Sequence, residues 1–168
     1  MELIRLFLAE LEAEGVRSRK ALEHVPEGQY DWKPHEKSMH FGYLSELVAT
    51  MPSWITMAVN QDSLDLNPTG GQGYQRPNLR TRAALMKALD DAVAEAKAAL
   101  GATTESHLMT PWQLLVGGHV VMESPRYDVV AETLRHLAHH RGQMTVYLRL
   151  LGATVPALYG PSADEKTF

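Results

Sequence analysis

Three histidines near the end of the chain, His136, His139 and His140, have the residue type and spacing for metal chemistry. Residues four apart lie on one face of a helix, so a helix here would present the imidazoles of His136 and His140 to one point. Helices chelate zinc, nickel or iron with such pairs. His139 falls on the flank and is the weaker ligand candidate. A metal site at His136 and His140 is therefore one hypothesis, and a pair of hydrogen-bonded core histidines is the alternative.

The sequence around these histidines predicts a long helix over residues 127–151. Ser124 is a suitable N-cap, Pro125 suits the first helical position, and a glycine follows the last residue. Helical periodicity places His140 on the inward face, with His136 one turn earlier on nearly the same line. The complete inward stripe is Thr133, Leu137, His140, Met144, Tyr147 and Leu151.

Three further stretches have helical periodicity and must supply the surroundings of this helix. Residues 4–22 place apolar side chains on one face, and residues 81–100 are rich in strong helix formers. Residues 42–60 repeat apolar residues at three- and four-residue spacing. Pro52 should kink or interrupt the stretch 42–60, because proline removes a backbone donor.

Two long connections separate the helices. Residues 61–77 contain consecutive turn formers and predict a long loop, whereas residues 112–122 either form a small hairpin or pack as loop. Four helices joined in this way predict an all-α chain, folded as a four-helix bundle with a long crossover connection. The length suits one domain spanning residues 1–168.

Composition narrows the chemistry. The 168 residues contain no cysteine, which excludes disulfides, thiolate zinc sites and a cysteine nucleophile, so any metal must be held by His, Asp or Glu. The net charge of -4 argues against a general nucleic-acid partner. No apolar run approaches the roughly 20 residues that span a bilayer, and the N-terminus is not a secretory signal. We expect a cytoplasmic protein without membrane or nucleic-acid partners.

Two parts of the sequence resemble the DinB superfamily of DinB/YfiT-like helical proteins. One is the stretch 136–143, with its three histidines, Arg, Gly and Gln, together with the tail at 155–165. The other is the segment 32–44, and Trp112 and residues 123–126 also fit. The resemblance covers nearly the whole chain. It implies a DinB/YfiT-like four-helix bundle with a long crossover, often homodimeric, with a site for a divalent metal ion.

The metal site implied by this resemblance has three histidines, one from the second helix and two from the fourth. The latter two correspond to His136 and His140, but the first corresponds to Leu47, which cannot bind a metal. Glu46 is adjacent but points about 100° away around the helix. His40 lies roughly 10 Å along the axis and contributes only if the helix begins later or bends. The sequence thus predicts a zinc or nickel site weakened by Leu47.

Three functions remain open. One is a divalent-metal-dependent enzyme, a hydrolase or a small-thiol-dependent transferase, that acts on a small molecule at His136 and His140. Another is a non-catalytic dimeric bundle that binds an apolar small molecule beside Leu47, Met51 and Met144. The third is a purely structural interaction module. The secondary candidates each have a simpler structural explanation. They are Arg141 and Arg149 for binding an anionic group, Tyr147 as a proton donor, Glu123 as a base, and Trp32, Trp54 and Trp112 as a dimer surface.

Overall fold

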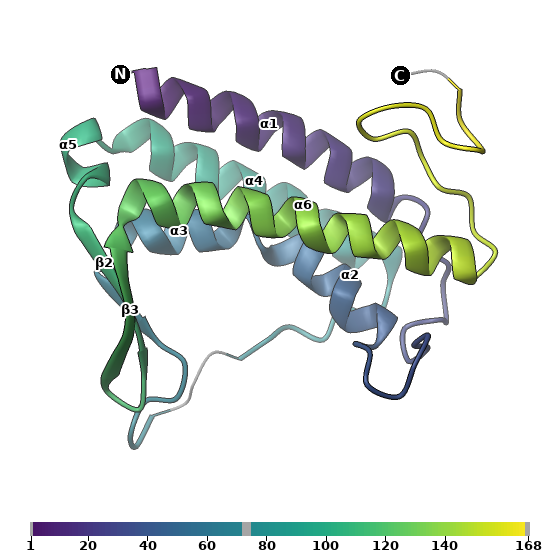
Figure 1. Ribbon diagram of the computed structural model, residues 1–168, viewed down its shortest axis with the longest axis horizontal. Helices are drawn as coiled ribbons and strands as arrows, with labels where there is room; N and C mark the ends of the chain where they lie inside the picture. Colours follow the sequence, from purple (N-terminus) through teal and green to yellow (C-terminus); the bar gives the residue numbers. More distant parts are fainter. Residues whose placement is uncertain (1, 72–74, 167–168) are drawn as a thin grey trace.

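Four helical segments run alongside one another (Figure 1). They are α1 (Glu2–Leu22), the interrupted pair α2 (Phe41–Thr50) and α3 (Ser53–Asn60), α4 (Arg82–Ala102) and α6 (Arg126–Leu150). In this computed structural model, which describes residues 2–71 and 75–166, α1, α2 and α3 each pack against both α4 and α6. The four helical stretches predicted from periodicity are confirmed close to their predicted bounds. A short α5 (Glu105–Leu108) follows α4.

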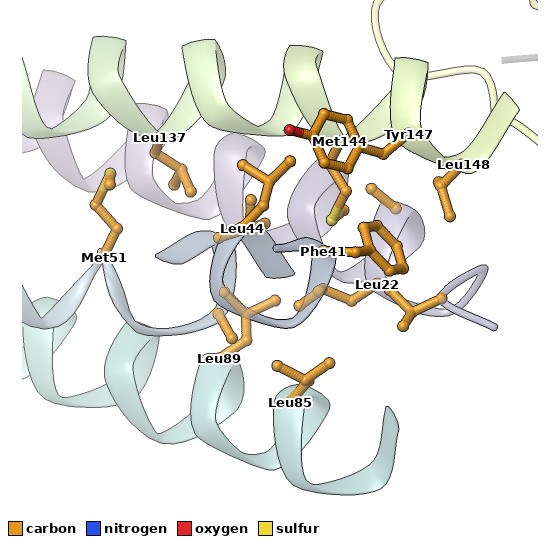
Figure 2. Packing of buried hydrophobic residues seen from close by; sticks show 14 of the residues in the cluster. Leu22, Phe41, Leu44, Met51, Leu85, Leu89, Leu137, Met144, Tyr147 and Leu148 are labelled. Atoms are coloured by element: carbon orange, nitrogen blue, oxygen red, sulfur yellow. The ribbon is translucent and has the colours of Figure 1, made fainter. Parts of the chain in front are cut away.

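Apolar side chains from α1, α2, α4 and α6 meet between the helices and form one core cluster (Figure 2). Its members include Leu22, Phe41, Leu44, Met51, Leu85, Leu89, Leu137, Met144, Tyr147 and Leu148. Met51 and Met144 are completely buried in this cluster. They therefore cannot line an open pocket beside Leu47, as the binding hypothesis expected.

The predicted interruption at Pro52 is confirmed. Helix α2 ends at Thr50, and the N–H of Met51 donates to Leu47 O at 2.9 Å. Pro52 then occupies the N-cap of α3, where its missing N–H costs no intrahelical hydrogen bond. Both α2 and α3 nevertheless pack along α6.

A small three-stranded sheet lies beyond one end of the helices (Figure 1). Strand β2 (Pro111–Val116) is central, parallel to β1 (Ser63–Asp65) and antiparallel to β3 (His119–Pro125). Gly117 and Gly118 join β2 to β3 with φ values of +60° and +79°, which suit a two-residue hairpin turn. The expectation of an entirely helical chain is thus not met over these strands, although the hairpin was one of the two alternatives for residues 112–122.

The hairpin shifts the start of α6. Ser124 and Pro125 still belong to β3, and Pro125 takes the N-cap position, so the prediction of Ser124 as N-cap is wrong by one residue. At the other end, Gly152 has φ +73°, and the N–H of Ala153 donates to Leu148 O at 3.0 Å in a Schellman motif. Within the described residues, no helix is both long and apolar enough to cross a membrane.

Candidate functional site

His136 and His140 lie together on α6, as their spacing predicted. Their ring centroids are 4.6 Å apart and the ring planes differ by 33°. The His139 ring is exposed, 5.2 Å from that of His140 and 6.4 Å from that of His136. Trp54 of α3 meets the His136 ring edge-on at a centroid distance of 5.7 Å. The structure therefore brings the two strongest candidates together and leaves His139 at the side.

His140 is buried and oriented by a neighbour on its own helix. Only 9% of its surface is exposed, and its Nδ1 lies 2.8 Å from Gln143 Oε1. Because an amide oxygen only accepts hydrogen bonds, Nδ1 carries the proton and Nε2 keeps its lone pair. Burial lowers the pKa of His140 below the usual histidine value, with small contributions from His136 and His139, while the Gln143 hydrogen bond opposes the shift. His140 is therefore kept neutral, the form that binds metals.

Two contacts set the position of Leu47 relative to α6. Phe41, the first residue of α2, stacks on Tyr147 near the end of α6, and Trp54 of α3 contacts His136 earlier in α6. The α2–α3 pair therefore runs antiparallel to α6. Leu47 lies between Phe41 and Trp54 and is therefore opposite the α6 segment that contains His140. The partly buried Leu47 side chain packs against the core cluster. An apolar side chain thus occupies the position where a third ligand was expected.

Neither substitute for this third ligand is near the pair. The Glu46 carboxylate accepts a hydrogen bond from the Leu79 N–H at 3.3 Å and lies 4.0 Å from Arg76 Nη1. His40 Nδ1 is 2.7 Å from Asp31 O. Both side chains line a separate polar pocket beside residues 76–80. Over residues 2–71 and 75–166, no group of three or more His, Asp or Glu side chains has a metal-binding arrangement.

An apolar cavity of about 500 Å³ begins at His136. One wall is a single face of the small sheet, because residues alternate between faces along a strand. Leu64, Leu114 and Met122 are paired across the three strands, and all three line the cavity. Trp112 and Ser124 form the next paired row on the same face. The part of the fold that the sequence did not clearly predict thus forms one wall of an apolar cavity that includes His136.

The opposite wall of the cavity comes from α3 and α6. Trp54 and Met57 lie one turn apart on α3, while α6 contributes Asp128, Glu132 and His136 at intervals of four. The two acidic residues were missed in the sequence, although the same four-residue spacing that selects His140 leads back from His136 to both of them. His136 is therefore shared between the histidine pair and the cavity.

Arg141 is a structural residue and not an anion site. It is completely buried, and its guanidinium donates to the Glu14 carboxylate, to Ser18 Oγ at 3.0 Å and to Tyr159 OH. The Tyr159 hydroxyl also lies 3.1 Å from both Glu14 carboxylate oxygens. These contacts join α1, α6 and the C-terminal tail, so Arg141 has a carboxylate partner within the protein.

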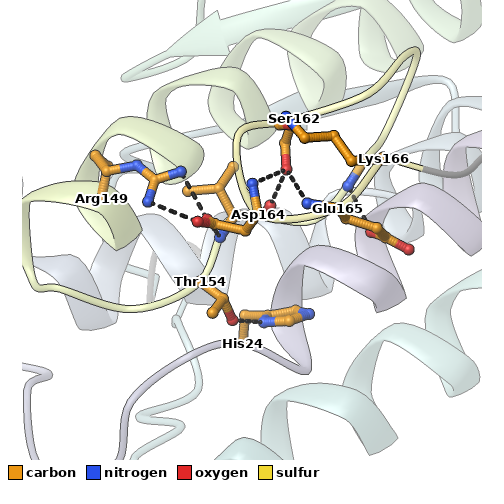
Figure 3. Close-up of polar contacts among 9 residues, drawn as sticks. His24, Arg149, Thr154, Ser162, Asp164, Glu165 and Lys166 are labelled. Carbon is orange, nitrogen blue, oxygen red and sulfur yellow. Dashed lines mark hydrogen bonds and ion pairs between the residues drawn. The ribbon is translucent and has the colours of Figure 1, made fainter.

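Arg149 has a similar role at the surface (Figure 3). Its guanidinium lies 2.6 Å from Asp164, whose carboxylate also accepts from the Val155 N–H at 2.8 Å. Ser162 Oγ accepts from two backbone N–H groups in the same tail. Arg149 lowers the pKa of the Asp164 carboxyl, which stays charged and holds the tail against α6.

Two other candidates have structural positions. The Tyr147 hydroxyl donates to Met39 O at 3.2 Å. Tyr147 is therefore a core tyrosine whose hydroxyl has a partner within the protein, which was the simpler structural explanation. Glu123 accepts from Gln113 Nε2 at 2.6 Å and alternates with Met122 and Ser124, so it lies on the sheet face away from the cavity. Neither residue is placed for acid or base chemistry at His136.

A comparison with protein-family models gives a match over residues 2–167 to the family described as the DinB family. The chain belongs to the DinB family. Two solved DinB-like structures have the same fold. One, from Bacillus cereus, has a TM-score of 0.69 and 20% identity, and the alignment covers 91% of this chain and 95% of that one. The other, YjoA from Bacillus subtilis, has a TM-score of 0.67 and 16% identity, with 96% and 99% of the two chains covered.

A curated relative is 44% identical to this DinB-family chain over 43 residues. It is named "Uncharacterized protein YrdA" from Bacillus subtilis. The alignment spans 26% of this chain and 26% of that protein. The family-model match shows the family, and the two solved structures show the fold.

The residues present fit a two-histidine metal site. The two imidazole rings lie 4.6 Å apart between centroids, and one of them, His140, is neutral and fixed in its tautomer by Gln143. A hydrogen bond to the second ring nitrogen is the usual support of a metal-binding histidine. The three-histidine set implied by the family resemblance is not present, because Leu47 packs where its first member is expected.

Proposed function

We propose that this DinB-family protein is a divalent-metal-dependent enzyme, either a hydrolase or a transferase that uses a small thiol. The observation that supports this best is that His136 belongs both to the histidine pair and to the lining of the apolar cavity. An ion bound at the pair would therefore be next to a space of about 500 Å³, a size typical of small-molecule sites.

In this proposal, His136 and His140 hold zinc or nickel, which when bound supplies Lewis acidity and a water or thiolate nucleophile at neutral pH. Gln143 orients His140 through its hydrogen bond, and Trp54 packs against His136. The apolar side chains of α3 and the sheet exclude water from the substrate. No side chain is assigned as acid or base.

The proposal includes the assembly and location expected from the sequence. The four packed helical segments form a DinB/YfiT-like four-helix bundle, and the connection between α3 and α4 is its long crossover. Two copies form a homodimer in the cytoplasm. The substrate is a small molecule.

The alternative is a non-catalytic dimeric binder of an apolar small molecule, and Leu47 favours it. With leucine opposite His140, two imidazoles hold an ion less tightly than three protein ligands would. The apolar cavity serves this function equally well. It lies between α3, α6 and the sheet and not beside Met51 and Met144, which are buried in the core.

Calorimetric titration of zinc and nickel into the tag-free, metal-stripped protein tests the proposal. We expect one ion per chain, and binding should disappear in His136→Ala. His35→Ala is the matched control, because His35 is exposed and outside the site. Leu47→His should tighten binding by at least tenfold. Absence of binding in the natural protein, combined with tight binding in Leu47→His, would favour the non-catalytic binder.

A further inference from the structure

The apolar cavity beside His136 has one charged side, which is formed by α6. Among the described residues that line the cavity, the Asp, Glu, Arg and Lys side chains are Asp128, Glu132 and Arg135. Asp128 and Glu132 are four residues apart, so both carboxylates lie on the same face of the helix. The walls from α3 and the sheet contribute mainly apolar and aromatic side chains. A molecule in the cavity therefore meets these charges along α6.

The two carboxylates share a single guanidinium. Arg135 Nε lies 3.1 Å from Glu132 Oε2, as an i,i+3 pair on the surface of α6. Arg135 Nη2 lies 4.0 Å from Asp128 Oδ1, which is too far for a hydrogen bond. The helix dipole favours a carboxylate at Asp128, in the first turn of α6, but it supplies no counterion. The charged side of the cavity therefore carries one net negative charge, and Asp128 is the carboxylate that is open to a further cation.

The charged side and the histidine pair lie at different positions along α6. Glu132 and Asp128 precede His136 by four and eight residues, which correspond to about 6 and 12 Å along the helix axis. Trp54 and Met122, on the facing walls, line the same cavity. A molecule with a cationic group beside Asp128 thus has room for an apolar body between that group and His136.

We propose that this cavity binds an amphiphilic cation, an amine whose ammonium group lies beside Asp128 and Glu132 and whose apolar body extends toward His136. Anions are selected against, because a carboxylate or phosphate would meet two carboxylates and a guanidinium that they already engage. Asp128 and Glu132 thereby determine both the charge and the orientation of the ligand. Such an amine is the substrate class of the His136–His140 site. This last assignment rests on the function proposed above, whereas binding of the amine requires no metal.

The test compares molecules that share a naphthalene body and differ in charge. Naphthylmethylamine is a cation at neutral pH, naphthylmethanol is uncharged and naphthoate is an anion. Each is titrated calorimetrically into metal-free protein in EDTA. Because the carboxylates are partly solvated, the amine should bind about fivefold tighter than the alcohol, which corresponds to about 1 kcal/mol, and naphthoate should bind more weakly than the alcohol. Absence of saturable amine binding, or equal affinities of amine and alcohol, would overturn the proposal.

Charge variants show whether the acidic side of the cavity makes this choice. Asp128→Asn leaves Glu132 paired with Arg135, so it should abolish the preference for the amine. Arg135→Gln removes the guanidinium and should increase that preference. The matched control is Glu123→Gln, which removes one negative charge on the sheet face away from the cavity and should leave the preference unchanged. A preserved preference in Asp128→Asn, or an equal loss in Glu123→Gln, would overturn the proposal.

These charge variants should keep the fold, because the side chains of Asp128 and Arg135 are 53% and 63% exposed. A further pair of variants locates the binding. Met122→Trp should weaken amine binding by about tenfold, because the larger side chain occupies space that the ligand needs. Its matched control is Val120→Trp, since Val120 is paired with Leu115 and does not line the cavity. Wild-type affinity in Met122→Trp would overturn the proposal.

Zinc titration of the same samples separates this inference from the proposed enzyme function. Amine binding without zinc binding would contradict the metal-dependent function and leave the cavity assignment in place. Zinc binding without amine binding would contradict the cavity assignment alone.

Discussion

The buried contact between Arg141 and Glu14 predicts that Arg141 stabilises the fold, although it lies in the same stretch, residues 136–143, as the two candidate metal ligands. Arg141 is completely buried, and Glu14 is 5% exposed. Glu14→Gln would leave the guanidinium without a carboxylate partner, although the amide oxygen would still accept one hydrogen bond. Breaking a buried ion pair costs about 3–5 kcal/mol, so we expect a loss near the lower end, about 3 kcal/mol.

Thermal and urea denaturation followed by circular dichroism measure this loss. For a chain of this length, a loss of about 3 kcal/mol corresponds to a fall in Tm of roughly 6–12 °C. Glu10→Gln is the matched control, because Glu10 is exposed one turn earlier on α1 and should change stability by less than about 0.5 kcal/mol. Adding Arg141→Met to Glu14→Gln should restore part of the stability, since it removes the unpaired buried charge. Equal melting of Glu14→Gln and Glu10→Gln would refute the structural role of this pair.

Three further predictions follow from single contacts. Burial lowers the pKa of His140, so the unfolded chain takes up this proton first and the free energy of unfolding should fall as pH decreases from about 6.5. Urea denaturation across this range should show a shallower fall in His140→Gln. Tyr147→Phe removes the hydrogen bond to Met39 O and should cost about 1 kcal/mol in denaturation experiments without changing zinc affinity. A weaker zinc affinity would give Tyr147 a role at the site. Asp164→Asn weakens the contact with Arg149, so limited proteolysis should cleave the tail faster than in the wild-type chain, and equal rates would contradict this.

The helical part of the fold was predictable because its signals are local. Apolar periodicity marks the four helical stretches, and Pro52 marks the interruption between α2 and α3. The sheet was harder to predict because β1 has three residues and pairs with β2, which lies about fifty positions further along the chain. A three-residue strand carries almost no periodic signal, and only the hairpin formed by β2 and β3 was visible as an alternative.

The candidate site was predicted to a similar extent. The spacing of His136 and His140 correctly indicated that their rings lie together, since helical geometry alone determines this. The cavity could not be predicted, because its lining combines α3, α6 and all three strands. The roles of Arg141 and Arg149 were also hidden, because their partners Glu14 and Asp164 come from a different helix and from the tail. Metal binding, the homodimer and the cytoplasmic location remain predictions.

A zinc-soaked crystal, measured at the zinc absorption edge, tests the central proposal most directly. We expect one anomalous peak per chain between the imidazoles of His136 and His140, beside the cavity that His136 lines. His139 and His40 should lie outside the coordination sphere. No peak at this pair, or a peak at other histidines only, would contradict the proposed metal site and leave the cavity as a site for metal-free binding.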